Sequence, residues 1–240
     1  MIETVRDLLA TSARIVAFTG AGISAESGIP TFRGAGGLWN QFRPEDLATP
    51  EAFRRDPKLV WEWYDWRRQI IARAEPNAGH RALAELERLK PEFALITQNV
   101  DGLHDRAGNR RLLKLHGDIW TVRCTKCGRE SEDRRPALPS LPPECDCGGL
   151  LRPGVVWFGE SLDRNVLRES ENLAKNAQVF LTIGTSAVVY PAAGLIEIAR
   201  GSGADVVEVN PDQTAYSDQV NYSFRGRSGE ILPRLLPQAD

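Results

Sequence analysis

The sequence has little that would direct it to a polyanion or a membrane. Its 30 basic and 32 acidic residues leave a net charge of -2, and no long block of like charge gives a case for nucleic-acid binding. No apolar stretch approaches the ~20 residues of a membrane helix. The start, MIETVRDLLATSARIVAF, lacks the basic region of a signal peptide. We therefore expect a soluble, cytoplasmic protein without a nucleic-acid or membrane partner.

Cysteine is also scarce, and its four copies are clustered. Cys124 and Cys127 form a CTKC motif, and Cys145 and Cys147 form a CDC motif after 17 intervening residues. This spacing is near that of a zinc ribbon, in which four thiolates close a tetrahedral site, so we expect a structural Zn²⁺. The CDC pair departs from the usual CxxC, which leaves its turn geometry open. Disulfides are the alternative, although a CxC bridge would be strained and no secretory context is evident.

Apolar runs alternate with segments of helical spacing along the chain. Strands are predicted at 13–20, 93–99, 178–184 and 204–210, and helices at 77–90 and 163–177. Near-continuous apolar strands are typical of a parallel sheet that is covered on both faces. The alternation predicts an α/β, doubly wound (Rossmann-like) sheet, with ligands at the carboxyl ends of its strands.

Two regions interrupt this alternation. Residues 36–76 are rich in tryptophan and predicted helical, and residues 117–153 hold the cysteines. We expect both insertions to form a small domain, with residues 1–35, 77–116 and 154–240 making the Rossmann-like domain.

A glycine-rich turn, TGAGISAESGIPTFRG, follows the first strand. Its glycines Gly20, Gly22 and Gly28 would let the backbone approach a pyrophosphate. The spacing is not GxGxxG, which disfavours a dehydrogenase and leaves another dinucleotide geometry, or a plain tight turn, as the alternatives.

The three histidines differ in context. His116 ends the apolar run RLLKLHGD, where a strand would open toward a ligand, so catalytic and structural roles are both open. His80 lies near a helix start and His104 in a loop, and for both we favour structural hydrogen bonding.

Five blocks together resemble one family. GAGISAESGIPTFRG, TQNVDGLHDRAG, LHGDIWTVRCTKCG, LRPGVVWFGE and IGTSAVVYPAAGL are similar to sirtuins, NAD-dependent protein-lysine deacylases, in the family's order and from residue 16 to about 230. The resemblance implies NAD as cofactor, acylated lysine in proteins or peptides as substrate, and a bacterial or archaeal type of enzyme.

The resemblance also implies the NAD-binding residues. The NAD phosphates would lie at Gly20, Ala21, Gly22 and Ser24, beside Phe32, Arg33 and Trp39. Nicotinamide and its ribose would lie at Gln98, Asn99, Val100 and Asp101. The adenosine half would lie at Gly184, Thr185, Ser186, Asn210, Pro211, Asp212 and Ser228.

The implied chemistry makes His116, Asn99 and Asp101 the catalytic residues. The acyl oxygen attacks the ribose C1′ of NAD and displaces nicotinamide, and His116 then acts as general base on the ribose hydroxyls. Asn99 and Asp101 would orient nicotinamide and water. Lysine and 2′-O-acyl-ADP-ribose are the expected products.

Substrate contacts are expected from two places. GVVWFGE (154–160) is predicted to be an edge strand that pairs with the substrate peptide through Val156, Phe158, Gly159 and Glu160. On the helix around VWEWYDWRRQII (60–71), Leu59, Trp63, Trp66 and Ile70 are predicted to form a core stripe.

On the same helix, Tyr64 and Arg67 share a neighbouring face. This pair resembles the sirtuin class that removes succinyl and malonyl groups, in which Arg67 and Tyr64 would hold a distal carboxylate and small Ala48 would leave room for it. An ordinary amphipathic flank is the alternative.

Other functions remain possible from the sequence. Protein mono-ADP-ribosyl transfer would use the same pocket, and a non-catalytic NAD-binding or zinc-ribbon adaptor is the alternative from another class. We expect a monomer.

Overall fold

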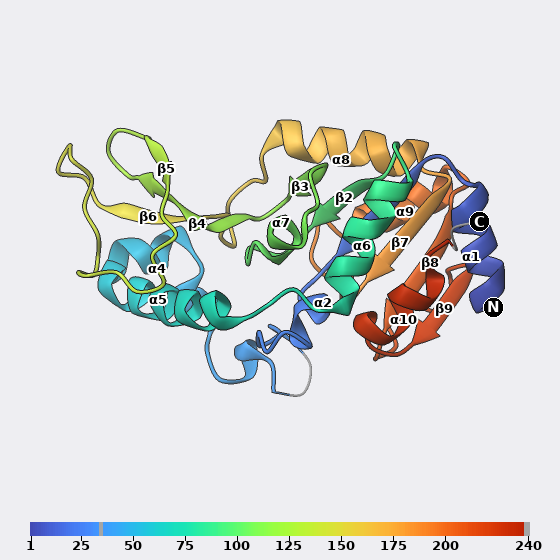
Figure 1. The fold of residues 1–240 in the computed structure, drawn as a ribbon. Helices are drawn as coiled ribbons and strands as arrows, with labels where there is room; N and C mark the ends of the chain where they lie inside the picture. Colours follow the sequence, from blue (N-terminus) through green and yellow to red (C-terminus); the bar gives the residue numbers. More distant parts are fainter. Residues whose placement is uncertain (34–35, 238–240) are drawn as a thin grey trace.

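The computed structural model in Figure 1 describes residues 1–33 and 36–237. The predicted boundary at residue 35 lies outside the described residues, and the division into two domains stays a prediction. Within the described part of the chain, no helix is long and apolar enough to cross a membrane.

A six-stranded sheet forms the larger part of the molecule. Its order is β3 (Leu112–Lys114), β2 (Ala94–Thr97), β1 (Ile15–Thr19), β7 (Val179–Ile183), β8 (Asp205–Asn210) and β9 (Tyr222–Arg225). All neighbouring pairs are parallel. The four apolar runs expected to be strands are confirmed as β1, β2, β7 and β8.

Helices cover both faces of this sheet. One apolar core joins the sheet to α1 (Ile2–Thr11), α6 (Ala78–Leu89) and α10 (Ser228–Leu235). Another joins its opposite face to α8 (Arg164–Asn176) and α9 (Gly194–Gly201). The doubly wound fold is therefore confirmed, and its two cores explain why the central strands are apolar on both sides.

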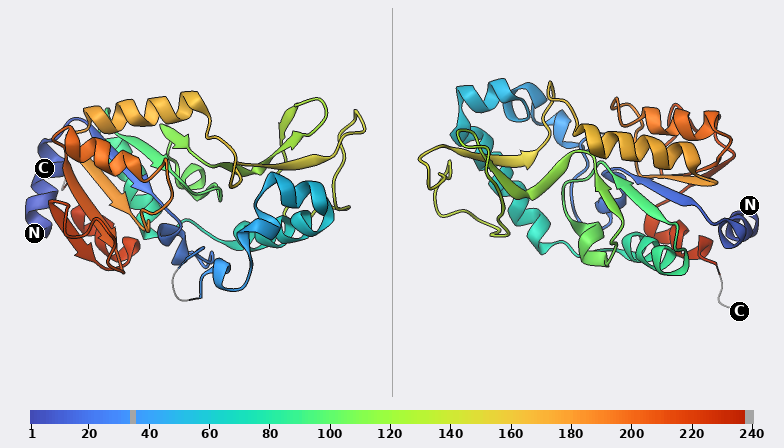
Figure 2. Two further views of the ribbon diagram at one scale, coloured as in Figure 1. Left: turned by 180° about the vertical axis from the view of Figure 1, so that it is seen from behind. Right: turned by 90° about the horizontal axis from the view of Figure 1, so that it is seen from above.

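The remaining elements build a second lobe, at the end of the molecule away from the two termini (Figure 2). It contains the 3-10 helix η1 (Leu38–Asn40), the helices α3 (Pro44–Leu47), α4 (Pro50–Arg55) and α5 (Pro57–Arg73), and an antiparallel sheet of order β5 (Glu130–Glu132), β4 (Gly117–Cys124) and β6 (Leu151–Val155). A third core, rich in tryptophan, joins α5 to β4 and β6. Two short helices, α2 (Gly22–Ala25) and α7 (Leu103–Ala107), follow β1 and β2.

The buried stripe of α5 is shifted by one residue from the predicted one, although Trp63, a member of the predicted stripe, is buried as expected at 5% exposure. Leu59 and Trp66 are 43% and 40% exposed, whereas the buried positions at the same spacing are Val60, Tyr64, Arg67 and Ile71. The physical reason is that this face of α5 packs partly against the tryptophan-rich core and partly against a cavity that Tyr64 and Arg67 line, so a polar side chain can lie on it. Asp56 caps the helix by accepting from the Leu59 amide at 2.9 Å.

The strand predicted over residues 154–160 is also shorter than expected. β6 ends at Val155, which pairs with Gly117 of β4. The Val156 amide still donates to the His116 carbonyl, but the Phe158 amide donates to the Ala48 carbonyl outside the sheet, each at 2.9 Å. Gly159 then adopts φ +85°, which turns the chain.

Candidate active site

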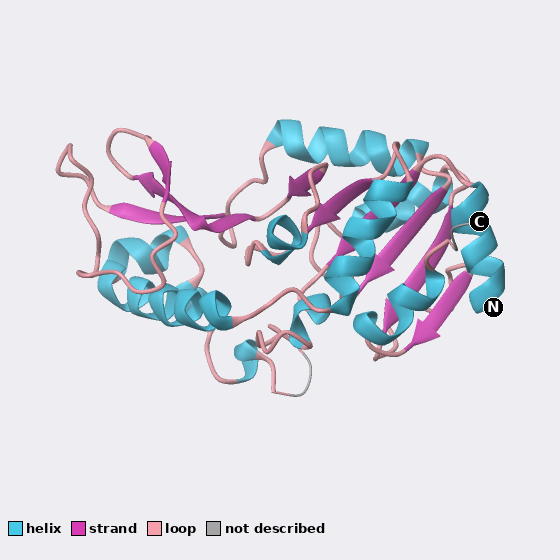
Figure 3. Cartoon of the chain, in the orientation of Figure 1, coloured by secondary structure: helices cyan, strands magenta, loops and turns pink. Residues whose placement is uncertain are grey.

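The parallel strands end toward the second lobe, as their arrowheads show in Figure 3. Between these ends and the second lobe lies a cavity of about 930 Å³. Since β1 has β2 on one side and β7 on the other, the chain order reverses here, and ligands of doubly wound sheets bind at such a point.

The structure brings almost all sequence-predicted site residues to this cavity. Its lining includes Gly20, Ala21, Gly22, Phe32, Arg33, Trp39, Ala48, Tyr64, Arg67, Gln98, Asn99, Val100, His116, Val156, Phe158, Gly159, Glu160, Gly184, Thr185, Ser186, Asn210, Pro211 and Asp212. Ser24, Asp101 and Ser228 do not line it; they are buried beside it. A volume near 930 Å³ suits a ligand of dinucleotide size.

The glycine-rich turn passes close to the end of β7. A Cβ atom on Gly22 would lie 2.7 Å from the Gly184 backbone, and one on Gly20 would lie 2.8 Å from it. The Gly22 amide donates to the Gly184 carbonyl at 2.8 Å. This approach explains both glycines structurally, and it presents bare backbone to the cavity, which a pyrophosphate needs.

Asp101 lies in a buried network behind the cavity wall. Its carboxylate accepts from the Ser24 hydroxyl and the Leu103 amide, each at 2.8 Å. Asn99 Nδ2 donates to the Gly20 carbonyl at 3.1 Å and to Ser24 at 3.3 Å. Burial raises the pKa of Asp101, opposed by the hydrogen bonds from Leu103 and Ser24. The network fixes the Asn99 amide at the cavity.

His116 is held by one ring nitrogen. Its Nδ1 lies 3.0 Å from the Gln98 carbonyl oxygen, which can only accept, so Nδ1 carries the proton and Nε2 is left as an acceptor. Burial lowers the pKa of His116, against the effect of this hydrogen bond. The imidazole is therefore neutral at neutral pH, as a general base requires.

The other two histidines make structural hydrogen bonds, as expected. His80 completes the capping box of α6 with Asn77, and His104 Nε2 lies 3.0 Å from the Thr19 hydroxyl. Their rings pack 4.8 Å apart. Burial, with a smaller effect of Arg81, lowers the pKa of His80 to about 4.

Tyr64 and Arg67 meet at the aromatic end of the cavity. Tyr64 accepts a hydrogen bond from Trp157 Nε1 at 2.9 Å, and burial raises its pKa to about 12, so the phenol keeps its proton. Arg67 is 6% exposed, and its guanidinium lies 4.8 Å from the Phe32 ring centroid and 5.0 Å from that of Trp63. Among residues 1–33 and 36–237, it donates no hydrogen bond and forms no ion pair.

Glu160, which was expected to contact the substrate peptide, is bound by neighbouring residues of the protein. Its carboxylate accepts from Arg152 at 2.6 and 2.8 Å and from the Trp157 amide at 2.9 Å. Arg152 in turn stacks 3.5 Å from the Trp157 ring centroid. These contacts favour a structural role for Glu160 in the cavity wall.

The four cysteines form a separate site. Their Sγ atoms all lie within 4.8 Å of one another, and none is in a disulfide. The Lys126 and Cys127 amides donate to Cys124 Sγ at 3.4 Å. Gly148, at φ +74°, completes the turn that brings Cys147 to the cluster, so the CDC spacing is compatible with a tetrahedral site. Four thiolates fit Zn²⁺ and leave no open position.

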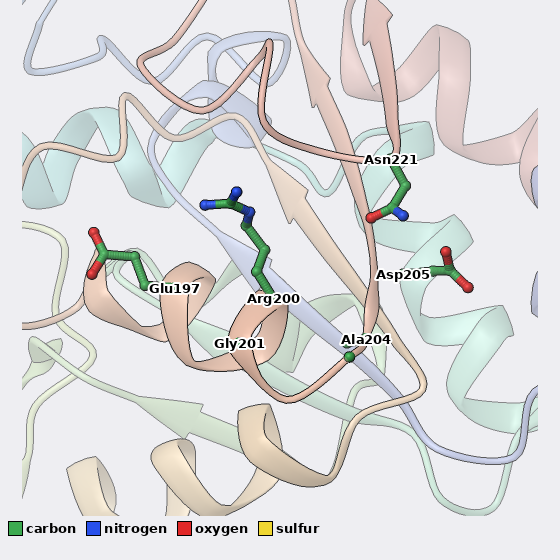
Figure 4. Close-up of a pocket in the computed structure, with 7 residues that line it drawn as sticks. Glu197, Arg200, Gly201, Ala204, Asp205 and Asn221 are labelled. Carbon is green, nitrogen blue, oxygen red and sulfur yellow. The ribbon is translucent and has the colours of Figure 1, made fainter.

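A second, smaller hollow lies at the amino end of β8 (Figure 4). Its Arg200 donates to Gln219 at 3.0 Å, its Asn221 accepts from the Val206 amide at 2.9 Å, and its Glu197 accepts from Tyr216 at 2.6 Å. These three side chains are already engaged by neighbours outside the hollow, whereas almost all sequence-predicted site residues lie at the larger cavity.

Sequence reasoning missed several residues that line the large cavity: Glu26, Trp63, Tyr190, Gln213, Thr214 and Arg227. Most lie in loops between elements, where no periodic pattern marks them. Tyr190 lies within one of the quoted blocks, IGTSAVVYPAAGL, which was the available signal.

Comparison with known proteins gives consistent matches. The Sir2 family matches residues 20–191. The NAD-dependent protein deacylase of Aquifex aeolicus is 57% identical over 222 residues, 92% of this chain and 93% of that protein. The NAD-dependent protein deacylase 1 of Archaeoglobus fulgidus is 51% identical over 238 residues, 98% of this chain and 97% of that protein.

Solved structures agree in fold. A Sir2 homologue in complex with NAD superposes with a TM-score of 0.90 at 51% identity, covering 97% of this chain and 91% of that one. Sir2 with a deacetylated p53 peptide and 3′-O-acetyl ADP ribose gives a TM-score of 0.87 at 34% identity, covering 98% and 96%.

Proposed function

Because this chain belongs to the Sir2 family, it is an NAD-dependent protein deacylase, and we propose that its cavity prefers acyl-lysines whose acyl chain ends in a carboxylate. Relatives over 50% identical carry the deacylase name, and family members have been solved with NAD and with an acetyl-ADP-ribose product. The observation that supports the preference is Arg67, a buried guanidinium that lines the cavity and forms no ion pair within the described residues, where the Asp101 carboxylate acts on it only through its charge.

NAD fits the residues at the strand ends. The Gly20–Gly22 turn would hold its phosphates, Gln98 and Asn99 its nicotinamide ribose, and Gly184 to Ser186 together with Asn210 to Asp212 its adenosine half. When bound, NAD supplies the ribose carbon that receives the acyl oxygen as nicotinamide leaves.

His116 supplies the base. Its Nδ1 proton is fixed on the Gln98 carbonyl, so Nε2 is free to take a proton from a hydroxyl in the cavity. The lowered pKa keeps this atom unprotonated at neutral pH.

Asn99 and Asp101 act by position and charge. The Asn99 amide is held by the Gly20 carbonyl, which leaves its Oδ1 to accept from an amide ligand or water. Asp101 holds Ser24 and the turn at Leu103, and so it keeps this wall of the cavity in place.

The acyl chain would extend toward α5. Ala48 is small, buried and beside the cavity, which leaves space before the Tyr64–Arg67 pair. A succinyl or malonyl carboxylate there would receive charge-assisted hydrogen bonds from Arg67 and one from the Tyr64 hydroxyl.

The cysteine cluster has a structural role. Cys124, Cys127, Cys145 and Cys147 would hold Zn²⁺, which would crosslink β4 to the loop before β6. None of them lines the cavity, so the metal takes no part in the reaction.

Product analysis tests the function. With NAD and acetyl- or succinyl-lysine peptide, we expect nicotinamide, free lysine peptide and acyl-ADP-ribose by mass spectrometry, and much less free lysine peptide and acyl-ADP-ribose with His116→Ala. ADP-ribose attached to protein would instead indicate mono-ADP-ribosyl transfer. If no acylated peptide leads to nicotinamide release, the result would indicate a non-catalytic NAD-binding protein.

A further inference from the structure

The loop over residues 211–217 forms one wall of the cavity without being a helix or a strand. Pro211, Asp212, Gln213 and Thr214 all line the cavity, yet the residues from 211 to 217 are turns and irregular chain. Such a loop needs side-chain anchors if it is to present a fixed surface to a ligand.

The anchor is the carboxylate of Glu208, in the middle of β8. Glu208 is 2% exposed. Its Oε2 accepts from Ser217 Oγ at 2.7 Å, Ser223 Oγ at 2.7 Å and Arg225 Nη1 at 2.9 Å. Its Oε1 accepts from the Thr214 hydroxyl. Two of these four donors, Thr214 and Ser217, belong to the loop.

A carboxylate is unusual at position 208, because this face of β8 packs into an apolar core. Residue Val206, two positions earlier on the same strand face, packs into the apolar core with α8 and α9. Burying a carboxylate among such residues is costly unless donors surround it. Burial raises the pKa of Glu208, but the hydrogen bonds from its four donors together lower it by more, so the pKa lies below its ordinary value. Glu208 is thus ionised at neutral pH and an acceptor only.

The donors of this carboxylate extend through the loop. The Thr214 amide donates to Ser217 Oγ at 2.8 Å, so Ser217 links Glu208 to the backbone at the cavity edge. Arg225 also reaches the Asp212 carbonyl at 3.3 Å, and Asn210 Nδ2 donates to the same carbonyl at 3.0 Å.

We propose that Glu208 is a positioning residue for NAD, whose buried carboxylate holds the 211–217 loop in the shape that receives the adenosine half of the dinucleotide. This inference rests on the proposed function, which places adenosine at that loop. Glu208 itself does not line the cavity, so it acts through Ser217 and Thr214.

Two serines provide a matched test. Ser217→Ala and Ser223→Ala each remove a 2.7 Å hydrogen bond to the same oxygen of Glu208. Only Ser217 lies in the loop, whereas Ser223 lies opposite Glu208 on β9. A general destabilisation of the buried carboxylate would therefore affect both variants, and a loss of loop position would affect Ser217→Ala alone.

The readouts are the Kd for ADP-ribose by calorimetry and the steady-state constants with an acylated peptide. We expect Ser217→Ala to raise the Kd and the KM for NAD by about threefold to tenfold, the effect of one or two hydrogen bonds. The kcat of Ser217→Ala at saturating NAD and its KM for peptide should be unchanged. For Ser223→Ala, the Kd for ADP-ribose, both KM values and kcat should stay within about twofold of the wild type, far below a tenfold effect.

Equal constants for the two variants would overturn the proposal, and so would a fall in kcat without a change in the KM for NAD. Glu208→Gln should weaken ADP-ribose binding further, because the amide NH₂ cannot accept from the loop hydroxyls. If Glu208→Gln does not fold, the comparison of Ser217→Ala with Ser223→Ala alone tests the proposal. Absence of turnover in the wild type would contradict the proposed function, while the ADP-ribose Kd values would still test Glu208.

Discussion

Replacement of Arg67 by methionine tests the acyl preference directly. Methionine keeps an unbranched apolar side chain and removes the charged guanidinium, which lies over the Phe32 and Trp63 rings. In the wild type this guanidinium is buried at the cavity, and within the described residues nothing accepts a hydrogen bond from it. A succinyl carboxylate would be its first partner, at about 1.5 to 3 kcal/mol for a charge-assisted hydrogen bond. At ~1.4 kcal/mol per tenfold, this is a factor of roughly 10 to 150.

The assay compares kcat/KM for one peptide that carries either succinyl-lysine or acetyl-lysine. Acetyl-lysine has no carboxylate, so its kcat/KM should hold or improve in Arg67→Met, while the succinyl-to-acetyl ratio should fall by about 10- to 150-fold. Tyr64→Phe, which loses one neutral hydroxyl, should lower the ratio by less. Arg73→Met, exposed on the same helix, should leave it unchanged. A ratio in Arg67→Met within about twofold of the wild type, well short of one charge-assisted bond, would refute the reasoning.

Four further outcomes follow from the structure. His116→Ala should lower kcat by about 10² to 10⁴-fold, the contribution of a general base, while circular dichroism and zinc content stay unchanged; near-normal turnover would remove His116 from the mechanism. Because the pKa of His80 falls to about 4 in the fold, the unfolded state binds the extra proton between pH ~6.5 and 4. The Tm should therefore decline with falling pH in that window, and less steeply in His80→Gln; identical slopes would contradict this. Cys124→Ser should reduce bound zinc below one ion per chain and lower the Tm, whereas full zinc content in the variant would exclude Cys124 as a ligand. Gly22→Ala, whose Cβ would lie 2.7 Å from Gly184, should destabilise the fold by roughly 1 to 3 kcal/mol in urea unfolding, and an unchanged midpoint would show that the turn can shift.

Four strands of the large sheet, β1, β2, β7 and β8, were predictable because each is buried on both faces along nearly its whole length. Residues 15–19 and 179–183 are buried at every position, and only a strand covered on both sides needs such a run. The cysteine cluster was predictable for a similar reason, since ligand spacing is local in sequence. Both features depend on near neighbours along the chain.

The buried face of α5 was not predictable by the same reasoning. Hydrophobic periodicity assigns arginine to the exposed face of a helix. It therefore favours as the buried face the more apolar stripe through Leu59 and Trp66 over the stripe that contains Arg67. The stripe that is buried includes Arg67 because a cavity, and not a core, lies against that part of the helix. Tyr64 and Arg67 were identified only through resemblance, and the one-residue shift places both on the buried face.

The loop contacts were beyond sequence reasoning for a different reason. Glu208 looks like one acidic residue in an apolar strand, and its donors at Thr214, Ser217 and Ser223 follow at irregular spacing. Only the return of the chain as β9, opposite β8, brings Ser223 to the carboxylate. A buried charge marks a position where long-range contacts decide the residue type.

Arg67 and Arg68 show how adjacent identical residues acquire different roles. Arg68 is buried between the rings of Trp61 and Trp120 and donates to the Asp133 carbonyl beyond β5. One residue earlier on the helix, a rotation of ~100°, Arg67 faces the cavity with no such acceptor in the described chain. The Asp133 carboxylate lies 3.7 Å from the Arg68 guanidinium, whereas within the described residues Arg67 forms no ion pair and interacts with the Asp101 carboxylate only through its charge. A buried charge without an ion-pair partner costs stability, and a ligand that brings a carboxylate to Arg67, as we propose, would offset this cost.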